Sequence, residues 1–142
     1  MKVKVKKLSP DAVLPYKGSA KAIGYDIVAT DVVEKEGSGF GYIEYRTGLA
    51  VEPEEGYYVE LYPRSSLSDT GLIMGNSVGV IDPDFRGELR FRFKYVQHSR
   101  KYEVGDRIGQ MVVRKDIPSE LELVEELSDS ERSDQGFGST GK

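Results

Sequence analysis

The sequence predicts an all-β domain, and two observations carry that prediction. Apolar and polar residues alternate with a period of two in residues 2–8, 56–63 and 87–96, the pattern of strands that bury one face. Stretches rich in Gly, Pro and Asp, such as "PEEG" and "DPDFRG", separate such segments at short intervals. Many short strands joined by frequent turns are typical of a sandwich or a barrel.

One stretch, "SSLSDTGL", has helical character over one or two turns. Ser65 or Ser66 is expected to cap its start, because a serine hydroxyl accepts hydrogen bonds from the free amides of a first turn. Gly71 is expected to end it. The fold is therefore all-β with one short helix.

The composition changes from Ser128 onward. Residues 128–142 hold one large apolar side chain, Phe137, among Ser, Asp, Gly and charged residues. Such a segment buries too little surface to offset the entropy lost on ordering. The sequence therefore predicts a β domain over residues 1–126 and a flexible arm over residues 127–142.

Composition excludes several classes of function. The 142 residues fit one domain, and the absence of cysteine excludes disulfides and thiol chemistry. The single histidine, His98, excludes a site built from several histidines and is expected in a solvated loop. A net charge of -4 argues against polymeric nucleic acid as a partner. No apolar run approaches the ~20 residues of a membrane span, so we expect a soluble, cytoplasmic protein.

Two carboxylates stand in the stretch "VGVIDPDFRGEL". The apolar residues before Asp82 predict a strand, Pro83 starts a turn, and Gly87 leads into a second strand, which makes a hairpin with Asp82 and Asp84 at its tip. Aspartate is common in turns, so a role in the turn and a role in chemistry both remain open.

A possible anion site follows the strand that ends in "LYP". Arg64, Ser65 and Ser66 supply a guanidinium fork, two hydroxyls and free backbone amides, which suit a phosphate. The alternative is a serine cap beside a surface arginine.

Two polar residues stand in apolar surroundings and need partners. Asp26 follows Gly24, a residue that permits close approach, and its partner is a backbone amide, an arginine or a hydrated cation. Gln110, in "GDRIGQMVV", must be satisfied by the core, by a ligand or by water.

The C-terminal "GFGSTGK" matches the start of a P-loop, but no strand, helix or following Ser/Thr accompanies it, so the match is coincidental. The arm instead offers Arg132, the ring of Phe137 and flexible amides around Gly138 and Ser139, which could close over a nucleotide. The alternative is an inert, glycine-rich end.

Taken together, these stretches resemble the five motifs of the deoxyuridine triphosphatase (dUTPase) family over Ala22 to Gly141. The matching motifs, in order, are "AIGYD", "PRSSLS", "GNSVGVIDPDFRGEL", "DRIGQMVV" and "RSDQGFGSTG". The resemblance implies a distorted jelly-roll or β-barrel subunit in a homotrimer with shared active sites. It also implies Mg²⁺-dependent hydrolysis of dUTP to dUMP and pyrophosphate.

The resemblance assigns roles residue by residue. Asp82 matches the carboxylate that activates the water attacking the α-phosphorus, and Asp26 matches an acid that touches Mg²⁺ through water. Phosphate contacts are implied for Arg64, Ser65, Ser66, Gln110, Arg132 and Ser139. Uracil and sugar contacts are implied for Asn76, Gly79, Val80, Ile81, Phe85, Arg90, Phe137 and Gly138.

Some positions depart from the family pattern. Phe85 replaces the usual Tyr and so keeps the flat ring without the hydroxyl, and Ser66 replaces a common Gly near the phosphates. Ser133 and Gln135 replace glycines of the arm, which restricts its closed geometry.

Two rival functions differ from dUTP hydrolysis in testable ways. A dCTP deaminase of the same fold requires a Glu where this chain has Arg92, so deamination is disfavoured. A nucleotide-gated regulatory protein would use an arm that orders on binding to present a surface to a partner.

Overall fold

The computed structural model describes residues 1–35, 41–97, 99–139 and 141, and the His98 prediction lies outside these residues. The strands are β1 (Val3–Lys7), β2 (Tyr25–Val28), β3 (Asp31–Lys35), β4 (Tyr42–Arg46), β5 (Leu49–Pro53), β6 (Tyr57–Tyr62), β7 (Leu72–Met74), β8 (Gly79–Ile81), β9 (Arg90–Tyr95) and β10 (Arg107–Lys115). One short helix, η1 (Ser65–Asp69), follows β6.

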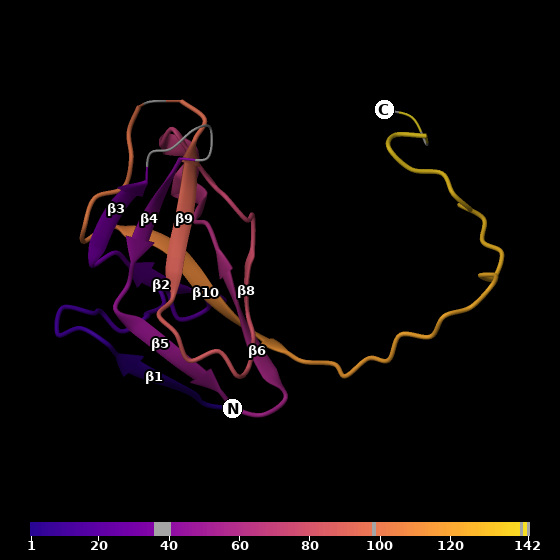
Figure 1. Ribbon diagram of the computed structural model, residues 1–142, viewed down its shortest axis with the longest axis horizontal. Coiled ribbons are helices and arrows are strands. Elements are labelled where there is room, and N and C mark those ends of the chain that lie inside the picture. The colour runs from indigo at the N-terminus through magenta and orange to yellow at the C-terminus, as the bar shows by residue number, and fades with distance from the viewer. Residues whose placement is uncertain (36–40, 98, 140, 142) are drawn as a thin grey trace.

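The described strands form three antiparallel sheets (Figure 1). One sheet has the order β2-β10-β6-β8, a second has the order β3-β4-β9-β7, and β1 pairs with β5 in the third. The predicted all-β, jelly-roll-like class is confirmed, although the sheets do not close into a barrel.

The core joins the two four-stranded sheets. Leu61 and Ile108 of the first sheet and Tyr45, Phe91 and Phe93 of the second are each at most 1% exposed. The Tyr45 ring meets Phe93 edge-on, with centroids 5.6 Å apart, an arrangement that aromatic pairs prefer. The Tyr45 hydroxyl donates a 2.8 Å hydrogen bond to the carbonyl of Tyr102, and burial raises the pKa of Tyr45 above its ordinary value.

The helix forms where expected, but its ends differ from the prediction. η1 is a 3₁₀ helix whose N-cap is Arg64, with extended backbone and no side-chain cap, so the expected serine cap is wrong. Ser65 and Ser66 lie inside the helix, after its N-cap, and the hydroxyl of Ser66 accepts a hydrogen bond from Arg64. Thr70, also extended, ends the helix in place of Gly71.

The predicted hairpin around Asp82 is also wrong. β8 pairs with β6, whereas β9 pairs with β4 and β7, so the turn between β8 and β9 passes from one sheet to the other. The turn itself is tight, because the amide of Phe85 donates a 3.1 Å hydrogen bond to the carbonyl of Asp82. Local sequence predicted the turn correctly but could not show which strand lies beside β8.

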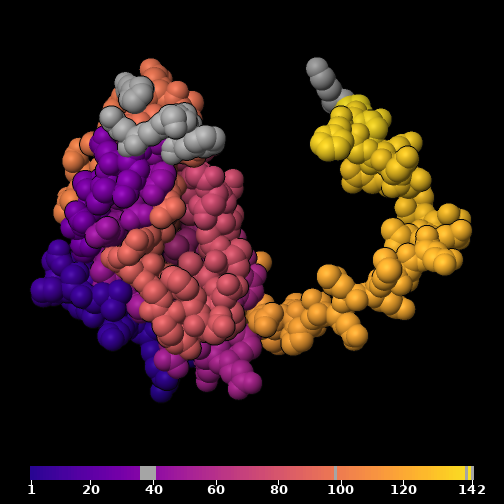
Figure 2. All heavy atoms as spheres, in the orientation of Figure 1, coloured from indigo at the N-terminus to yellow at the C-terminus, as the bar shows by residue number. Residues whose placement is uncertain are grey.

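The last strand ends at Lys115, and residues 116–139 form no further strand or helix. Leu121, Leu123 and Phe137 are fully or almost fully exposed. Figures 1 and 2 show this segment leading away from the body of the molecule. A domain boundary at residue 126 stays a prediction. Within the described part of the chain, no helix is long and apolar enough to cross a membrane.

Candidate active site

Asp26 of β2 lies between two arginines. Its Oδ1 accepts a 2.9 Å hydrogen bond from Nε of Arg64, and its Oδ2 accepts one of 3.0 Å from Arg107. The Asp26 side chain is only 12% exposed, so these charge-assisted bonds offset the cost of taking the carboxylate out of water. Of the partners open to Asp26, arginine is the one present.

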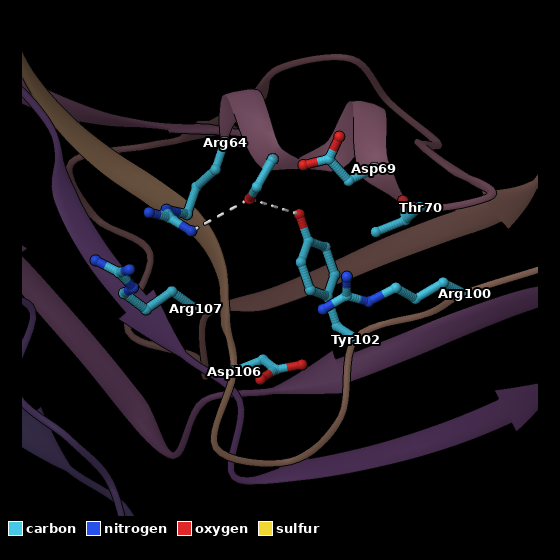
Figure 3. A pocket seen from close by; sticks show the side chains of 8 residues that line it. Arg64, Asp69, Thr70, Arg100, Tyr102, Asp106 and Arg107 are labelled. Carbon is cyan, nitrogen blue, oxygen red and sulfur yellow. Dashed lines mark hydrogen bonds between the residues drawn. The ribbon is translucent and has the colours of Figure 1, made fainter.

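Arg64 joins this pair to a small cationic pocket of about 200 Å³. Its NH1 donates 3.2 Å to the hydroxyl of Ser66, which lies 3.5 Å from the hydroxyl of Tyr102 (Figure 3). Figure 3 shows Arg64 and Arg107 on one side of Tyr102 and Arg100 on the other. The pocket is lined by Arg64, Ser66, Asp69, Thr70, Arg100, Tyr102, Asp106 and Arg107.

Gln110 of β10 contacts the backbone just before Arg64. Its Nε2 donates a 3.1 Å hydrogen bond to the carbonyl of Pro63, the residue before Arg64. A Cβ on Gly24 would overlap the Gln110 side chain, so the expected close approach at Gly24 is present. The structure therefore brings Asp26, Arg64 and Gln110 together, while Ser65 begins η1 with an exposed side chain.

A second cleft, of about 480 Å³, lies beside the loops before and after β8. The residues Asn76, Ile81, Phe85 and Arg90 line it together. We call it the hairpin-side cleft, because it lies beside the turn where the sequence predicted a hairpin. The Phe85 ring folds across Gly87, where a Cβ would collide with ring atoms. Its full lining is Tyr42, Gly75, Asn76, Ile81, Phe85, Glu88, Arg90, Arg92 and Lys94.

Asp82 and Val80 face away from that cleft. Neighbouring side chains of a strand point to opposite faces, so Val80 lies on the side opposite Gly79 and Ile81 and is 61% exposed. Val80 and Asp82 line a wider depression of about 880 Å³ with Arg114 and Lys115 of β10. Gly79 is buried and pairs with Leu61 of β6.

A buried carboxylate fixes the cationic wall of the hairpin-side cleft. Glu44 of β4 is 3% exposed and accepts hydrogen bonds of 2.8 Å from Arg92 and 3.3 Å from Arg90. Burial alone would raise the pKa of Glu44, but the hydrogen bond and charge of Arg92, with the charges of Arg90 and Arg46, bring it below its ordinary value.

The predicted arm residues lie far from both pockets within this chain (Figures 1 and 2). Arg132 donates a 2.9 Å hydrogen bond to the carbonyl of Gln135, which closes a turn inside the arm. Phe137 has a φ of 49° and Gly138 one of 84°, so the backbone turns sharply where the aromatic ring is presented. Ser139 closes a further turn on the carbonyl of Gly136.

Several polar residues at these pockets were not predicted as site residues, among them Arg107, Tyr102 and the buried Glu44, which binds two arginines of the cleft wall. Arg107 could not be identified from local sequence, because its bond to Asp26 depends on the pairing of β10 with β2. Tyr102 gave no sequence signal, because its neighbour Ser66 is distant in the chain. Glu44 did carry one, since a lone carboxylate between Ile43 and Tyr45 in an apolar strand requires a cationic partner.

Comparison with known proteins agrees with this site. The family model described as dUTPase matches residues 11–141. The deoxyuridine 5'-triphosphate nucleotidohydrolase of Nautilia profundicola is 41% identical, with both chains covered completely. A probable enzyme of the same name from Schizosaccharomyces pombe is 39% identical over 96% of each chain. The dUTPase of Staphylococcus bacteriophage 80alpha, solved with dUPNHPP, is 29% identical, with a TM-score of 0.80 over 99% of each chain.

The fold, the cationic pocket and these likenesses define the class of protein as a nucleotidohydrolase of the all-β type. The chain belongs to the dUTPase family and is a dUTP diphosphatase.

Proposed function

We propose that this enzyme hydrolyses dUTP to dUMP and pyrophosphate in active sites that three copies of the chain share. The observation that carries the proposal is the division of the expected site within one chain. The phosphate residues, the base and sugar residues, and the arm residues occupy separate regions, and the two pockets share no lining residue. Copies of the chain would bring these regions together across their interfaces.

The hairpin-side cleft suits the base and the sugar. The Asn76 amide offers both a donor and an acceptor, as the edge of uracil requires, and backbone groups of Gly79 to Ile81 lie next to it. The ring of Phe85, which lies against Gly87, would supply a flat surface beneath the deoxyribose and exclude a 2′-hydroxyl. Arg90 lines the same cleft.

The cationic pocket suits the triphosphate. Arg64 and Ser66 line it, Ser65 begins η1 between them in sequence, and Gln110 bonds the carbonyl of the preceding Pro63. Arg132 and Ser139 of another copy's arm would bind the far end of the triphosphate, while Phe137 and Gly138 cover the uracil.

Asp82 would act as the general base. It accepts a proton from a water molecule as the water oxygen attacks the α-phosphorus, and the bond from that phosphorus to the bridging oxygen breaks. Pyrophosphate leaves with the electron pair of the broken bond. Asp82 is exposed at the end of β8 and lines the wider depression on the other side of that strand, so the proposal requires the α-phosphorus to lie on that side, one residue beyond Ile81 of the cleft.

The residues fit Mg²⁺ only as part of the substrate. Among the described residues, no group of three or more His, Asp or Glu side chains could hold a metal ion. Both oxygens of Asp26 already accept bonds from arginines, yet each retains a lone pair for a water molecule carried by a Mg²⁺–triphosphate complex. The ion would neutralise charge on the triphosphate. The phage phi11 dUTPase, 26% identical with a TM-score of 0.73, is described with a structural Mg(II) ion.

The substrate panel tests the proposal. Purified protein is given dUTP, dCTP, dTTP or UTP with Mg²⁺, and nucleotide products and pyrophosphate are measured. We expect turnover of dUTP alone, and absence of dUTP turnover would overturn the proposal. Formation of dUTP from dCTP would favour the deaminase, which the presence of Arg92 in place of Glu disfavours.

A regulatory role is a second candidate. The phage 80alpha dUTPase is described as controlling transfer of virulence genes by a G protein-like mechanism. An exposed arm that orders over a nucleotide would provide such a switch in this chain. A partner that binds the dUpNHpp-loaded protein but not the empty protein would support this role beside the catalytic one.

A further inference from the structure

The charges of the chain are divided unevenly between residues 1–115, which hold the described strands and are called the body here, and the segment after them, which includes the predicted arm of residues 127–142. Residues 116–142 hold eight acidic residues and two basic ones, whereas residues 1–115 hold 16 acidic and 18 basic ones. The net negative charge of the protein therefore comes from its C-terminal segment, and the body is slightly cationic. Opposite charges on an exposed segment and a folded surface favour their association.

Much of the exposed positive charge of the second sheet lies along one strand. Arg90, Arg92 and Lys94 occupy every second position of β9, with Phe91 and Phe93 buried on the other face. We call these three cations the basic track. All three line the hairpin-side cleft, where Glu88 is the one acidic residue among the described lining residues.

Neighbouring side chains fix the positions of Arg90 and Arg92 of the basic track. The buried Glu44 binds Arg90 and Arg92, and Glu88 accepts a further 3.0 Å hydrogen bond from Arg90. The Arg92 guanidinium lies 4.5 Å from the centroid of the Tyr42 ring. The side chains of Arg90 and Arg92 nevertheless remain 43% and 56% exposed. Their charges are therefore oriented before any ligand arrives, which lowers the entropy lost on binding.

The arm carries a matching set of carboxylates. Asp129, Glu131 and Asp134, which we call the acidic run, precede Phe137 by three to eight residues. An extended chain advances at most about 3.3 Å per residue and this stretch contains turns, so roughly 10–26 Å is the upper limit of the distance from the acidic run to Phe137. The basic track spans about 13 Å along its strand, and Asp129 and Glu131 share its spacing of two residues.

We infer that the basic track docks the acidic run of another copy's arm and so holds the closed arm over the hairpin-side cleft. The inference rests on the proposed function, because Phe137 must reach the base in that cleft for the acidic run to lie beside β9. The occupant is a second copy of this chain, since the arm leads away from its own body.

A tryptophan reporter allows closure and docking to be tested separately. The chain contains no tryptophan, so Phe137→Trp in the full-length protein creates a single reporter on the arm. Its fluorescence is followed while the non-hydrolysable analogue dUpNHpp is added. A saturable change reports closure over the base, and a silent reporter would overturn the proposed arm closure and, with it, the docking inference.

Charge reversal then tests the docking. Lys94→Glu and Glu131→Lys are made separately and together in the reporter protein, and Lys7→Glu on the exposed β1 is the matched control. Arg92 is left unchanged because it neutralises the buried Glu44. Each single reversal should weaken arm closure about threefold to tenfold, and the double variant should recover most of the loss.

Salt dependence gives a second measurement that does not alter the folded body. In the reporter protein with neutral substitutions Asp129→Asn, Glu131→Gln and Asp134→Asn, arm closure should depend less on salt than in the unmodified reporter. Subtracting the two profiles removes the salt effect on triphosphate binding. Arm closure that responds normally to dUpNHpp but is unchanged by all these substitutions would overturn the docking inference and leave the proposed function standing.

Discussion

At the scale of single residues, the site depends on where side chains are held as much as on which side chains are present. Ser66 illustrates this. The sequence indicated a phosphate ligand or a helix cap, but its hydroxyl lies between Arg64 and Tyr102. It thereby links the cationic pocket to the aromatic core.

Replacing Asp82 should separate chemistry from binding. In Asp82→Asn the amide cannot accept the proton of the attacking water, so kcat for dUTP should fall about 10²- to 10⁴-fold. Binding of dUpNHpp, measured by calorimetry, should remain close to that of the unmodified protein. Loss of binding instead would show that Asp82 only shapes the turn, and Asp84→Asn is the matched control in that turn.

Gly87→Ala should impair sugar discrimination. A Cβ at position 87 would enter the space occupied by the Phe85 ring, so the ring must move away from the cleft. The ratio of kcat/KM for dUTP to that for UTP should fall severalfold, because the surface that excludes the 2′-hydroxyl is displaced. Gly105→Ala provides a control for added bulk, because a Cβ there would meet no heavy atom within 4 Å, although its φ of 92° adds strain. An unchanged ratio would contradict the assigned role of Phe85.

At the scale of elements, alternation along a strand decides what sequence can predict. β1, β6 and β9 were predictable because one face is apolar and the other polar over five or six residues. The partner of β8 was not predictable, because three residues carry too little pattern to select β6 over β9. Val80 and Asp82 lie on the face of β8 opposite Ile81, because neighbouring side chains of a strand point to opposite faces.

The same limit applies to the candidate site, where sequence could predict some residues but not others. Motif spacing identified Arg64, Asp26 and Gln110, whose polar groups needed partners that the structure supplies. It could not identify Tyr102, because the contact with Ser66 joins segments 36 residues apart in sequence. Long-range pairing, and not residue type, limits prediction here.

Pairing of β4 with β9 should give the fold an acid-sensitive contact at Glu44. The folded pKa of Glu44 is lowered, so its contribution to stability is present above the unfolded value near 4.5 and is lost as the pH falls through the folded pKa. Thermal melts from about pH 7 to about pH 3 should show Tm falling with acid, and Glu44→Gln should flatten that fall while lowering Tm at neutral pH. The exposed Glu52→Gln is the control and should change Tm little.

At the scale of the whole molecule, the arm and the body should be separable. Deleting Arg132 to Lys142 removes a segment whose described residues are mostly exposed and lead away from the body (Figure 2), so the folded domain should keep its Tm. Sedimentation should still give three copies of a subunit, each smaller than the full 15.8 kDa chain by the deleted residues, while dUTP turnover is largely lost. A truncated enzyme of full activity would show that the arm takes no part in catalysis.

The buried Tyr45 hydroxyl also sets an alkaline limit for the entire fold. Its folded pKa is raised by burial above the ordinary value of 10.0, so the stability it contributes is full below that pH and declines as the pH rises further. Unfolding then becomes the easier route to the phenolate. The chain holds nine tyrosines, so the measured signal is the difference in tyrosinate absorbance between the unmodified protein and Tyr45→Phe, which should rise together with loss of circular dichroism above about pH 10. Because the Tyr45 hydroxyl ionises more easily in the unfolded chain than in the core, strong base favours unfolding of this protein.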